Sequence, residues 1–344
     1  MRIALLTNSF PPQRGGAATI ASAQADVLRG AGHEVRIWCP LITWFSSPAP
    51  MRLIRHLADL FPSNRIVRDI AAWNPDVLLT HNLTGCGFGT ASVLQRNGIR
   101  WMHVLHDVQL FEPSGRLIAL AVTRWQMMWS FLRRRFFGGP DLVVSPTRWL
   151  LEQHKRRGFF SETAVEILPN PAPEAQFALR MPQEPMQLLL IGASREKGAD
   201  FATQLVNKLP FDAVLHLIGA GIPRDDGRII FHGGKEPSEI LEMMKQADAL
   251  LVPSTIAENQ PTVILEAASV GLPVVAADIG GIAETLDGSG LLCPSEDLEA
   301  WKDALLYLRD AGAYSQQAAS MYELARRHDP IAYASALNQL ISNL

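Results

Sequence analysis

The 344-residue sequence predicts an α/β protein of two doubly wound domains, each with a parallel sheet covered by helices on both faces. Short apolar runs bounded by turn residues alternate with helix-like stretches along the whole chain, which is typical of parallel sheets buried on both faces. The length is about twice the roughly 150 residues of one domain. Hydrophobic residues make up 48% of the chain, which is enough for two cores.

The expected strands are short apolar runs. In the first half they span residues 3–7, 34–39, 77–80, 101–105, 142–145 and 165–168, and in the second half 187–192, 213–219, 228–231, 249–253 and 272–276. Helices are expected between them, as in a doubly wound sheet. Such sheets bind ligands beyond the carboxyl ends of their strands, so the segments after each strand are the places to look for a site.

The boundary between the domains is expected at L-P-N-P-A-P-E-A, residues 168–175. Three prolines in five positions force an extended connection, because proline and the residue before it avoid the helical conformation. We therefore expect a first domain over residues 1–170 and a second over residues 171–330, followed by a terminal helix over residues 331–344.

The two halves carry opposite net charge. Residues 1–172 hold 19 Lys and Arg against 11 Asp and Glu (+8), whereas residues 173–344 hold 12 against 23 (−11), which together give −3. The basic half is expected to face an anionic partner.

Cysteine spacing and hydropathy exclude several classes of protein. Cys39, Cys86 and Cys293 are far apart and form no C-x-x-C pair, which argues against a disulfide framework or a structural zinc site and fits a reducing compartment. The amino-terminal apolar stretch indicates a first strand and not a leader peptide. No window approaches the roughly 20 apolar residues of a membrane span, so we expect a cytoplasmic protein.

The most informative segment is P-S-T-I-A-E-N-Q-P-T-V-I-L-E-A-A-S-V-G-L-P-V-V-A-A-D-I-G-G-I-A-E, residues 253–284. Pro261 suits the first position of a helix, which places Glu258 on the preceding loop and Glu266 inside the helix. A carboxylate within an apolar run needs a polar partner. The first free amides, at Thr262 and Val263, favour an anion. A phosphate seat flanked by two carboxylates indicates a nucleotide sugar as ligand.

Glu258 and Glu266, with seven residues between them and followed by G-L-P-V-V-A and G-G-I-A-E, resemble the E-x7-E signature of the family 4 retaining glycosyltransferases, the glycosyl transferases of group 1. This resemblance implies the GT-B fold, in which two Rossmann-like domains hold the substrates in the cleft between them. It also implies that helix 331–344 packs back on the first domain.

The resemblance assigns separate roles within the segment. Glu258 is implied to be a catalytic residue that contacts the hydroxyls of the donor sugar, and Glu266 to bind the nucleotide ribose. Gln260, Pro261 and the amides of Thr262 and Val263 are implied to line the donor site.

Two glycine pairs are expected near the donor. In F-P-P-Q-R-G-G, residues 10–16, Gly15 and Gly16 let backbone amides approach a diphosphate without a Cβ in the way. The alternative is a flexible loop with a helix cap. The G-x-G-x-x-G motif of nicotinamide-dinucleotide-binding proteins is missing there, which argues against a dehydrogenase. Gly219 and Gly221, in L-I-G-A-G, resemble the family's strand-to-loop pair.

Cations follow the first strand of the second domain, in I-G-A-S-R-E-K-G, residues 191–198. Arg195 and Lys197 can neutralise a diphosphate and stabilise the leaving nucleotide. Lys197-Gly198 matches the family's lysine-glycine pair, which implies a catalytic and donor-binding role for Lys197. Ala193 stands where the family has an arginine. Arg195 either replaces that arginine from a shifted position or is a solvated surface charge.

Histidines follow two strands of the first domain. His106 and Asp107 come after 101–105, and His81 and Asn82 come after 77–80. His106 is expected to be a catalytic residue that hydrogen-bonds the donor sugar or acceptor, because a histidine pKa lies near physiological pH. The family has a histidine in this setting, and His103 would lie within the strand. His81, Asn82 and Asp107 are expected to shape the acceptor pocket, and the alternative for both histidines is a structural role.

The run at residues 113–137 is apolar, aromatic and basic. It fits a helix at a membrane interface, with arginines on anionic headgroups, or a core helix with a basic end. Its arginines and the neighbours that would extend the basic face are Arg116, Arg124, Arg133, Arg134, Arg135, Arg52, Arg55, Arg156 and Arg157.

These features predict a transferase that moves a sugar from a nucleoside diphosphate to a hydroxyl of a lipid-linked or surface glycan, such as a polysaccharide or lipopolysaccharide intermediate. No metal is expected, because no strand-end Asp-x-Asp motif is present, and no cofactor or nucleic-acid partner is expected. The family resemblance implies a same-face displacement in which the leaving phosphate helps to deprotonate the acceptor. A nucleotide-sugar 2-epimerase of similar fold and a non-catalytic nucleotide-sugar-binding protein are the alternatives.

Overall fold

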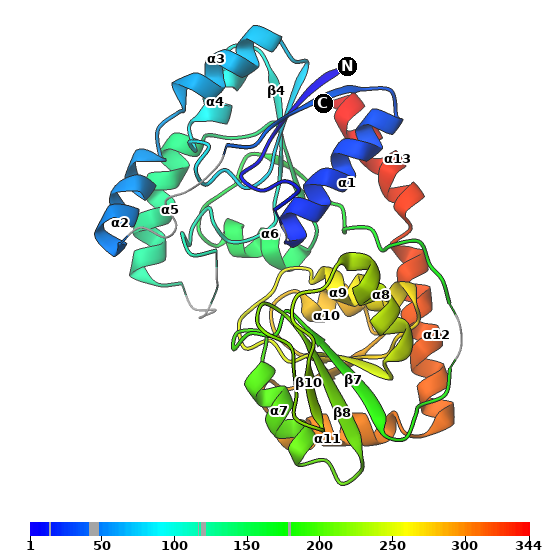
Figure 1. Cartoon of the computed structure of the whole chain (residues 1–344). Helices are drawn as coiled ribbons and strands as arrows, with labels where there is room; N and C mark the ends of the chain where they lie inside the picture. The colour runs from blue at the N-terminus through cyan, green and yellow to red at the C-terminus, as the bar shows by residue number, and fades with distance from the viewer. Residues whose placement is uncertain (14, 41–47, 116, 118–121, 178–179) are drawn as a thin grey trace. The chain divides into compact units, whose positions relative to one another are not determined.

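The computed structural model describes residues 1–13, 15–40, 48–115, 117, 122–177 and 180–344. The chain divides into two compact units (Figure 1). Unit 1 consists of Met1–Pro169 and Ile331–Leu344, and unit 2 of Asn170–Pro330. The division falls within L-P-N-P-A-P-E-A, one residue before the predicted boundary.

Unit 1 is built on a sheet with the strand order β2-β1-β3-β4-β5-β6, in which all neighbours are parallel. Because β1 lies between β2 and β3, the direction of winding reverses there, and the loops after β1 and β3 flank the crevice where such sheets bind ligands. The strands are β1 (Arg2–Leu6), β2 (Glu34–Trp38), β3 (Val77–Thr80), β4 (Arg100–Val104), β5 (Leu142–Ser145) and β6 (Ala164–Ile167). The helices are α1 (Gly16–Gly30), α2 (Ala49–Ala58), α3 (Asn64–Trp73), α4 (Thr90–Arg96), α5 (Arg124–Phe137), α6 (Arg148–Lys155) and the terminal α13 (Pro330–Asn343).

The terminal helix α13 is part of the core of unit 1. Leu337 and Ile341 are fully buried in one cluster with Leu5 of β1. Gln24 Nε2 of α1 donates a hydrogen bond of 2.6 Å to the hydroxyl of Tyr333. The last turns of the chain therefore complete the fold that its first strand begins.

Unit 2 is built on a sheet with the order β13-β12-β11-β7-β8-β10-β9, in which only the edge strand β9 is antiparallel to its neighbour. Its strands are β7 (Met186–Ile191), β8 (Ala213–Ile218), β9 (Arg224–Asp225), β10 (Ile229–Phe231), β11 (Ala249–Val252), β12 (Val274–Ala277) and β13 (Leu291–Cys293). Its helices are α7 (Ala199–Asn207), α8 (Pro237–Gln246), α9 (Thr262–Ser269), α10 (Ile282–Leu286), α11 (Leu298–Tyr307) and α12 (Ala311–Arg327).

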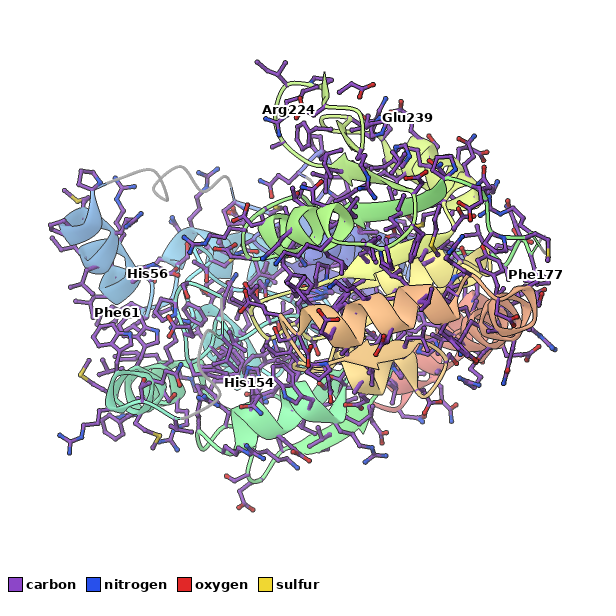
Figure 2. The ribbon with its side chains drawn as sticks, turned by 90° about the horizontal axis from the view of Figure 1, so that it is seen from below. His56, Phe61, His154, Phe177, Arg224 and Glu239 are labelled. Atoms are coloured by element: carbon purple, nitrogen blue, oxygen red, sulfur yellow. The ribbon has the colours of Figure 1, made fainter. Side chains whose placement is uncertain are left out.

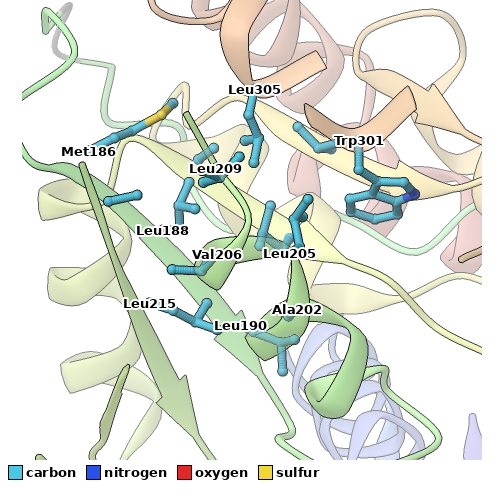
Figure 3. Close-up of a cluster of buried hydrophobic side chains, with 14 of the residues drawn as sticks. Met186, Leu188, Leu190, Ala202, Leu205, Val206, Leu209, Leu215, Trp301 and Leu305 are labelled. Atoms are coloured by element: carbon cyan, nitrogen blue, oxygen red, sulfur yellow. The ribbon is translucent and has the colours of Figure 1, made fainter. Parts of the chain in front are cut away.

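Both faces of the unit 2 sheet are buried. Successive strand residues point to opposite faces, and β7 follows this rule: Leu188 and Leu190 join the core with Trp301 of α11 (Figure 3), whereas Leu189 joins a second core with Ile264 of α9. This two-sided burial confirms the doubly wound architecture expected from the apolar runs.

Each predicted strand is present, with its ends shifted by at most two residues. The sequence analysis missed β9 and β13, which have only two and three residues. It also placed Pro261 as the first residue of α9, but the helix begins at Thr262, because Pro261 has an extended ψ of 114° and caps it. The helix within 113–137 is only α5, which begins after Thr123, whose side chain accepts from the Gln126 amide at 3.1 Å. Arg116 and residues 118–121 lie outside the described residues.

Candidate active site

The topology of unit 2 explains why Lys197 and Glu258 meet. In the order β11-β7-β8, the winding reverses between β7 and β11, so the loops after these two strands flank the switch point of the sheet. Lys197 comes from the loop after β7 and Glu258 from the loop after β11. Their side chains form an ion pair between Lys197 Nζ and Glu258 Oε2.

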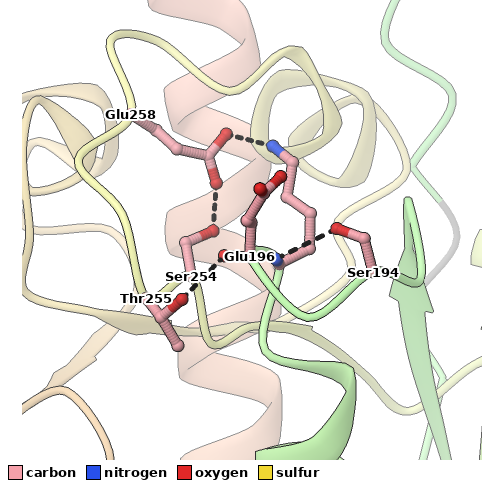
Figure 4. Close-up of polar contacts among 6 residues, drawn as sticks. Ser194, Glu196, Ser254, Thr255 and Glu258 are labelled. Carbon is pink, nitrogen blue, oxygen red and sulfur yellow. Dashed lines mark hydrogen bonds and ion pairs between the residues drawn. The ribbon is translucent and has the colours of Figure 1, made fainter. Parts of the chain in front are cut away.

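The two loops are also joined through their backbones. The Thr255 amide donates to the Glu196 carbonyl at 2.9 Å, and the Thr255 hydroxyl donates to the same carbonyl at 3.3 Å (Figure 4). Gly198 has a φ of +76°, and a Cβ on it would lie 2.0 Å from the carbonyl oxygen of Pro253. The glycine after Lys197 is therefore required for the close approach of the two loops.

Glu258 is held from three sides. Its other carboxylate oxygen accepts a hydrogen bond from the hydroxyl of Ser254, which is fully buried (Figure 4). The amide of Gly281 donates to the Glu258 carbonyl at 2.7 Å. A Cβ on Gly280 would lie 2.3 Å from that carbonyl oxygen. The sequence alone suggested no role for Ser254, Gly280 or Gly281. The G-G-I-A-E motif was the one sequence feature that could have pointed to the two glycines.

The start of α9 lies directly after this loop. The amides of Thr262 and Val263 are in the first turn, where helix amides lack intrahelical partners and favour an anion. Glu266 follows one turn later and is mostly buried. Burial raises the pKa of Glu266, and a hydrogen bond with the Thr262 side chain opposes the rise. Gln260 Oε1 accepts from the Asn170 amide at 2.7 Å, so it links this loop to the first residue of unit 2.

The other residues expected on the donor side occupy the neighbouring loops. Ala193, at the position of the missing arginine, donates its amide to the Ile218 carbonyl at 2.8 Å. A Cβ on Gly219 would lie 2.9 Å from the Ala193 nitrogen, and one on Gly221 would lie 2.8 Å from the ring of Phe231. The glycine pair thus permits close backbone packing.

Arg195 and the first glycine pair are more open. Arg195 is exposed at the turn before Lys197. Gly15 precedes α1 with a φ of +141°, which favours glycine, and a Cβ there would meet no atom within 4 Å. Gly16 is the first residue of α1 and is exposed, so the amides of this helix start are accessible.

In unit 1 the predicted acceptor-side residues lie together after β3 and β4. His81 Nδ1 is 2.6 Å from His106 Nε2, with the rings stacked. Asn82 Nδ2 donates to Asp107 at 2.9 Å. These residues line a cavity of about 10 Å³, the room of about one water molecule. His103 lies within β4, as expected.

The expected titration of His106 near physiological pH is wrong. Burial lowers the pKa of His106 to about 4 and that of His81 well below its usual value. Both rings are therefore neutral at pH 7, and one hydrogen bond joins them. Burial raises the pKa of Asp107 to about 6, against the hydrogen bonds from the Gln109 amide and Asn82.

Two protein-family descriptions match successive parts of the chain. The model for Glycosyltransferase Family 4 matches residues 14–175, and that for Glycosyl transferases group 1 matches residues 185–310. Together the two matches cover most of the chain, which therefore belongs to the glycosyltransferases of family 4 and group 1. The family 4 match covers the loop of Gly15 and Gly16 and the His81–Asp107 cluster, whereas the group 1 match covers Lys197, Glu258 and Glu266.

Individual proteins are similar to this glycosyltransferase over most or all of its length. It is 25% identical over 364 residues, 89% of each chain, to a GDP-mannose-dependent alpha-(1-6)-phosphatidylinositol monomannoside mannosyltransferase of Mycobacterium tuberculosis. A sucrose-phosphate synthase of Thermosynechococcus elongatus has a TM-score of 0.72 at 18% identity, covering 99% of this chain and 98% of the other. Anabaena HepE in complex with UDP-glucose has a TM-score of 0.69 at 17% identity over the full length of both chains. The structural similarities confirm the predicted GT-B fold.

Proposed function

We propose that this glycosyltransferase moves a hexose from a nucleoside diphosphate to a hydroxyl of a lipid-linked glycan, with retention of anomeric configuration and without a metal ion. The observation that carries the proposal is the Lys197–Glu258 pair at the switch point of the unit 2 sheet, directly before the first amides of α9. A cation and free amides suit a diphosphate, and a carboxylate suits sugar hydroxyls.

The pair has separate roles when the donor binds. Lys197 is 39% exposed at its side chain and can turn to the diphosphate, whereas Glu258 is 12% exposed and is fixed by Ser254. Glu258 then accepts hydrogen bonds from the sugar hydroxyls, and Glu266 from the ribose. The mycobacterial relative is named for GDP-mannose and HepE was solved with UDP-glucose, which supports a nucleoside diphosphate hexose as donor.

The proposed reaction is a displacement on one face of the sugar. The bond between the anomeric carbon and the diphosphate oxygen breaks, the acceptor oxygen bonds to the same carbon on the same face, and the acceptor proton passes to the leaving phosphate. Lys197 and the α9 amides offset the negative charge that develops on the leaving group. Neutral His106 orients a hydroxyl of the donor sugar or the acceptor.

The acceptor is proposed to be lipid-linked and used at the cytoplasmic face of a membrane. Two observations support this class. The first half of the chain has a net charge of +8, which suits an anionic lipid or phosphate group. The mycobacterial relative is named for a phosphatidylinositol-linked acceptor.

The test is the mass of products after incubation of the purified chain with UDP-glucose, GDP-mannose or an ADP-sugar and a membrane lipid extract. The proposal expects one donor to give a lipid product heavier by one hexose, with retained configuration by NMR and unchanged yield in EDTA. Glu258→Ala is expected to lose the product. Release of free nucleotide with an epimerised sugar would identify an epimerase, and binding without a product would identify a non-catalytic protein.

A further inference from the structure

Unit 1 exposes an unusual concentration of large hydrophobic side chains. Of the eighteen that the described part of the chain exposes, ten lie in α2, in α5 or directly beside them. Isolated exposed apolar residues are normal, but a contiguous group marks an interaction site. The ten are Met51, Leu53, Ile54, Leu57, Phe61, Val122, Trp125, Met127, Met128 and Phe131.

Helix α2 has its apolar face outward. Leu53, Ile54 and Leu57 lie on one side of the helix by their spacing, and they are 46%, 59% and 41% exposed. From Pro50 to Ala58 only His56 is partly buried. A surface helix of a water-soluble domain normally turns its apolar side to the core. In α2 the residue that faces the protein is a histidine.

Helix α5 is arranged in the same way. Its buried side carries three polar residues, Gln126, Ser130 and Arg133, beside Trp129 and Phe137, whereas Trp125 and Phe131 on the other side are 46% and 64% exposed. The buried polar groups have specific neighbours: Gln126 Oε1 accepts from Arg157 Nη2 at 2.9 Å, and the Arg133 guanidinium lies 4.0 Å from the centre of the Phe88 ring. The outward position of the apolar residues is therefore built into the packing.

Aromatic ring contacts join the two helices. The ring of His56 meets Trp129 edge-on at 6.2 Å, and Phe61, just after α2, meets Phe136 at 4.9 Å. Figure 2 shows His56 and Phe61 between α2 and α5. Trp129 also stacks on the exposed Trp125 at 5.9 Å. These ring contacts hold the inner side of α2 and the segment after it against α5.

The charge of this surface is of one sign. Neither α2 nor the segment 122–137 contains an acidic residue. Arg52 and Arg55 of α2 and Arg124 and Arg135 of α5 are exposed. Outward aliphatic and aromatic side chains flanked by arginines are the composition of elements that lie in the headgroup region of anionic bilayers. In the described part of the chain, no helix is both long and apolar enough to cross a bilayer.

We infer that α2 and α5 form an interfacial surface by which the protein seats on an anionic phospholipid bilayer. The apolar side chains enter the boundary between headgroups and acyl chains, and the four arginines bind lipid phosphates. The partner of unit 1 is thus a bilayer. This inference rests on the proposed function in one respect: the contact with the bilayer would bring the enzyme to a lipid-linked acceptor.

The interfacial surface is connected to the acceptor-side cluster. Asp59, at the end of α2, accepts hydrogen bonds from the amides of Gly85 and Gly87 at 2.7 and 2.8 Å. These glycines belong to the loop after β3, which also carries Asn82, whose side chain donates to Asp107. The end of α2 is therefore hydrogen-bonded to the loop that is proposed to shape the acceptor pocket.

The experiment is flotation of the full chain with vesicles of phosphatidylcholine alone or of phosphatidylcholine and phosphatidylglycerol. We expect binding to the anionic vesicles at low salt and a strong decrease at high salt, because arginine–headgroup attraction is screened. Each arginine removed from Arg52, Arg55 or Arg124 is expected to lower the partition coefficient about fivefold. Ile54→Ser with Phe131→Ser is expected to lower it at least tenfold, because two apolar anchors are lost.

The controls are Ile331→Ser and Arg326→Ser, which remove an exposed aliphatic side chain and an exposed arginine elsewhere. Both are expected to bind vesicles like the unchanged protein. Circular dichroism verifies that the Ile54→Ser/Phe131→Ser protein is folded.

Three results would overturn the inference. They are equal binding to neutral and anionic vesicles, no binding at low salt, or a dimer in light scattering that the Ile54→Ser/Phe131→Ser change dissociates. The dimer would mean that a second copy covers the surface. Calorimetric binding of the donor separates this inference from the proposed function. If the protein binds the donor but not the vesicles, only the inference of an interfacial surface is refuted. If it binds the vesicles but not the donor, only the proposed transferase function is refuted.

Discussion

Gly280 lies directly against the backbone of Glu258. A Cβ on Gly280 would be 2.3 Å from the Glu258 carbonyl oxygen and 2.8 Å from its nitrogen. The loop that carries the proposed catalytic carboxylate is thus seated on the glycine pair after β12. Its position depends on a contact between segments more than twenty residues apart in the sequence.

Gly280→Ala is expected to lower kcat/KM for sugar transfer about 100-fold, because displacement of a reacting group by about 1 Å has a cost of this order. Gly288→Ala is the matched control. Gly288 has a similar φ of +78°, but a Cβ there would meet no atom within 4 Å. Equal losses in the two variants would show that backbone strain, and not the contact with Glu258, causes the defect.

Ser254→Ala is expected to lower kcat/KM about 10- to 100-fold, the usual effect of losing a hydrogen bond to a charged group. The Ser254 hydroxyl donates to Glu258 and orients it. Thr255→Val removes the neighbouring hydroxyl, which donates to the Glu196 carbonyl at 3.3 Å, and is expected to retain most activity. Steady-state kinetics check both, and a larger loss in Thr255→Val than in Ser254→Ala would refute this role.

The transfer rate is expected to fall as the pH decreases through about 6. The pKa of Asp107 is raised to about 6, so the carboxylate that accepts from Asn82 is present above this pH and becomes protonated below it. Asp107→Asn is expected to have lower activity without this acidic limb. If the limb persists unchanged in Asp107→Asn, another group such as Glu266 is responsible for it.

Leu337→Ala in α13 is expected to destabilise unit 1 by about 2–5 kcal/mol, the usual cost of a buried Leu→Ala change, because Leu337 is fully buried. Seven of the eight tryptophans belong to unit 1, so unfolding followed by tryptophan fluorescence reports mainly on this unit. Leu306→Ala, at a residue that is 49% exposed, is expected to change stability by about 0.5 kcal/mol or less. An unchanged fluorescence transition for Leu337→Ala would contradict the role of the terminal helix.

The ends of the strands and the family signature could be predicted from the sequence. Lys197 and Glu258 each follow a predicted strand, and the winding order of a doubly wound sheet brings such loops together. The contact of Gly280 with Glu258 could not be predicted, because it depends on tertiary packing that sequence patterns do not specify. The lowered pKa of His106 has the same origin, since burial is a property of the folded unit.

Helix α5 shows a second limit of sequence patterns. The composition of residues 113–137 left an interfacial helix and a core helix as alternatives. Periodicity separates an apolar side from a polar side, but it does not say which side meets the protein. The structure supplies that information, since Trp125 and Phe131 are exposed while Arg133 is fully buried.

The loops that carry Lys197 and Glu258 are proposed to bind the nucleotide sugar and to be the place of sugar transfer. The most direct measurement compares donor affinity by calorimetry with product formation in the unchanged protein, Lys197→Ala and Glu258→Ala. We expect Lys197→Ala to weaken donor binding at least tenfold, and Glu258→Ala to abolish transfer while the nucleoside diphosphate still binds. Full transfer by Glu258→Ala, or donor affinity unchanged in Lys197→Ala, would contradict it.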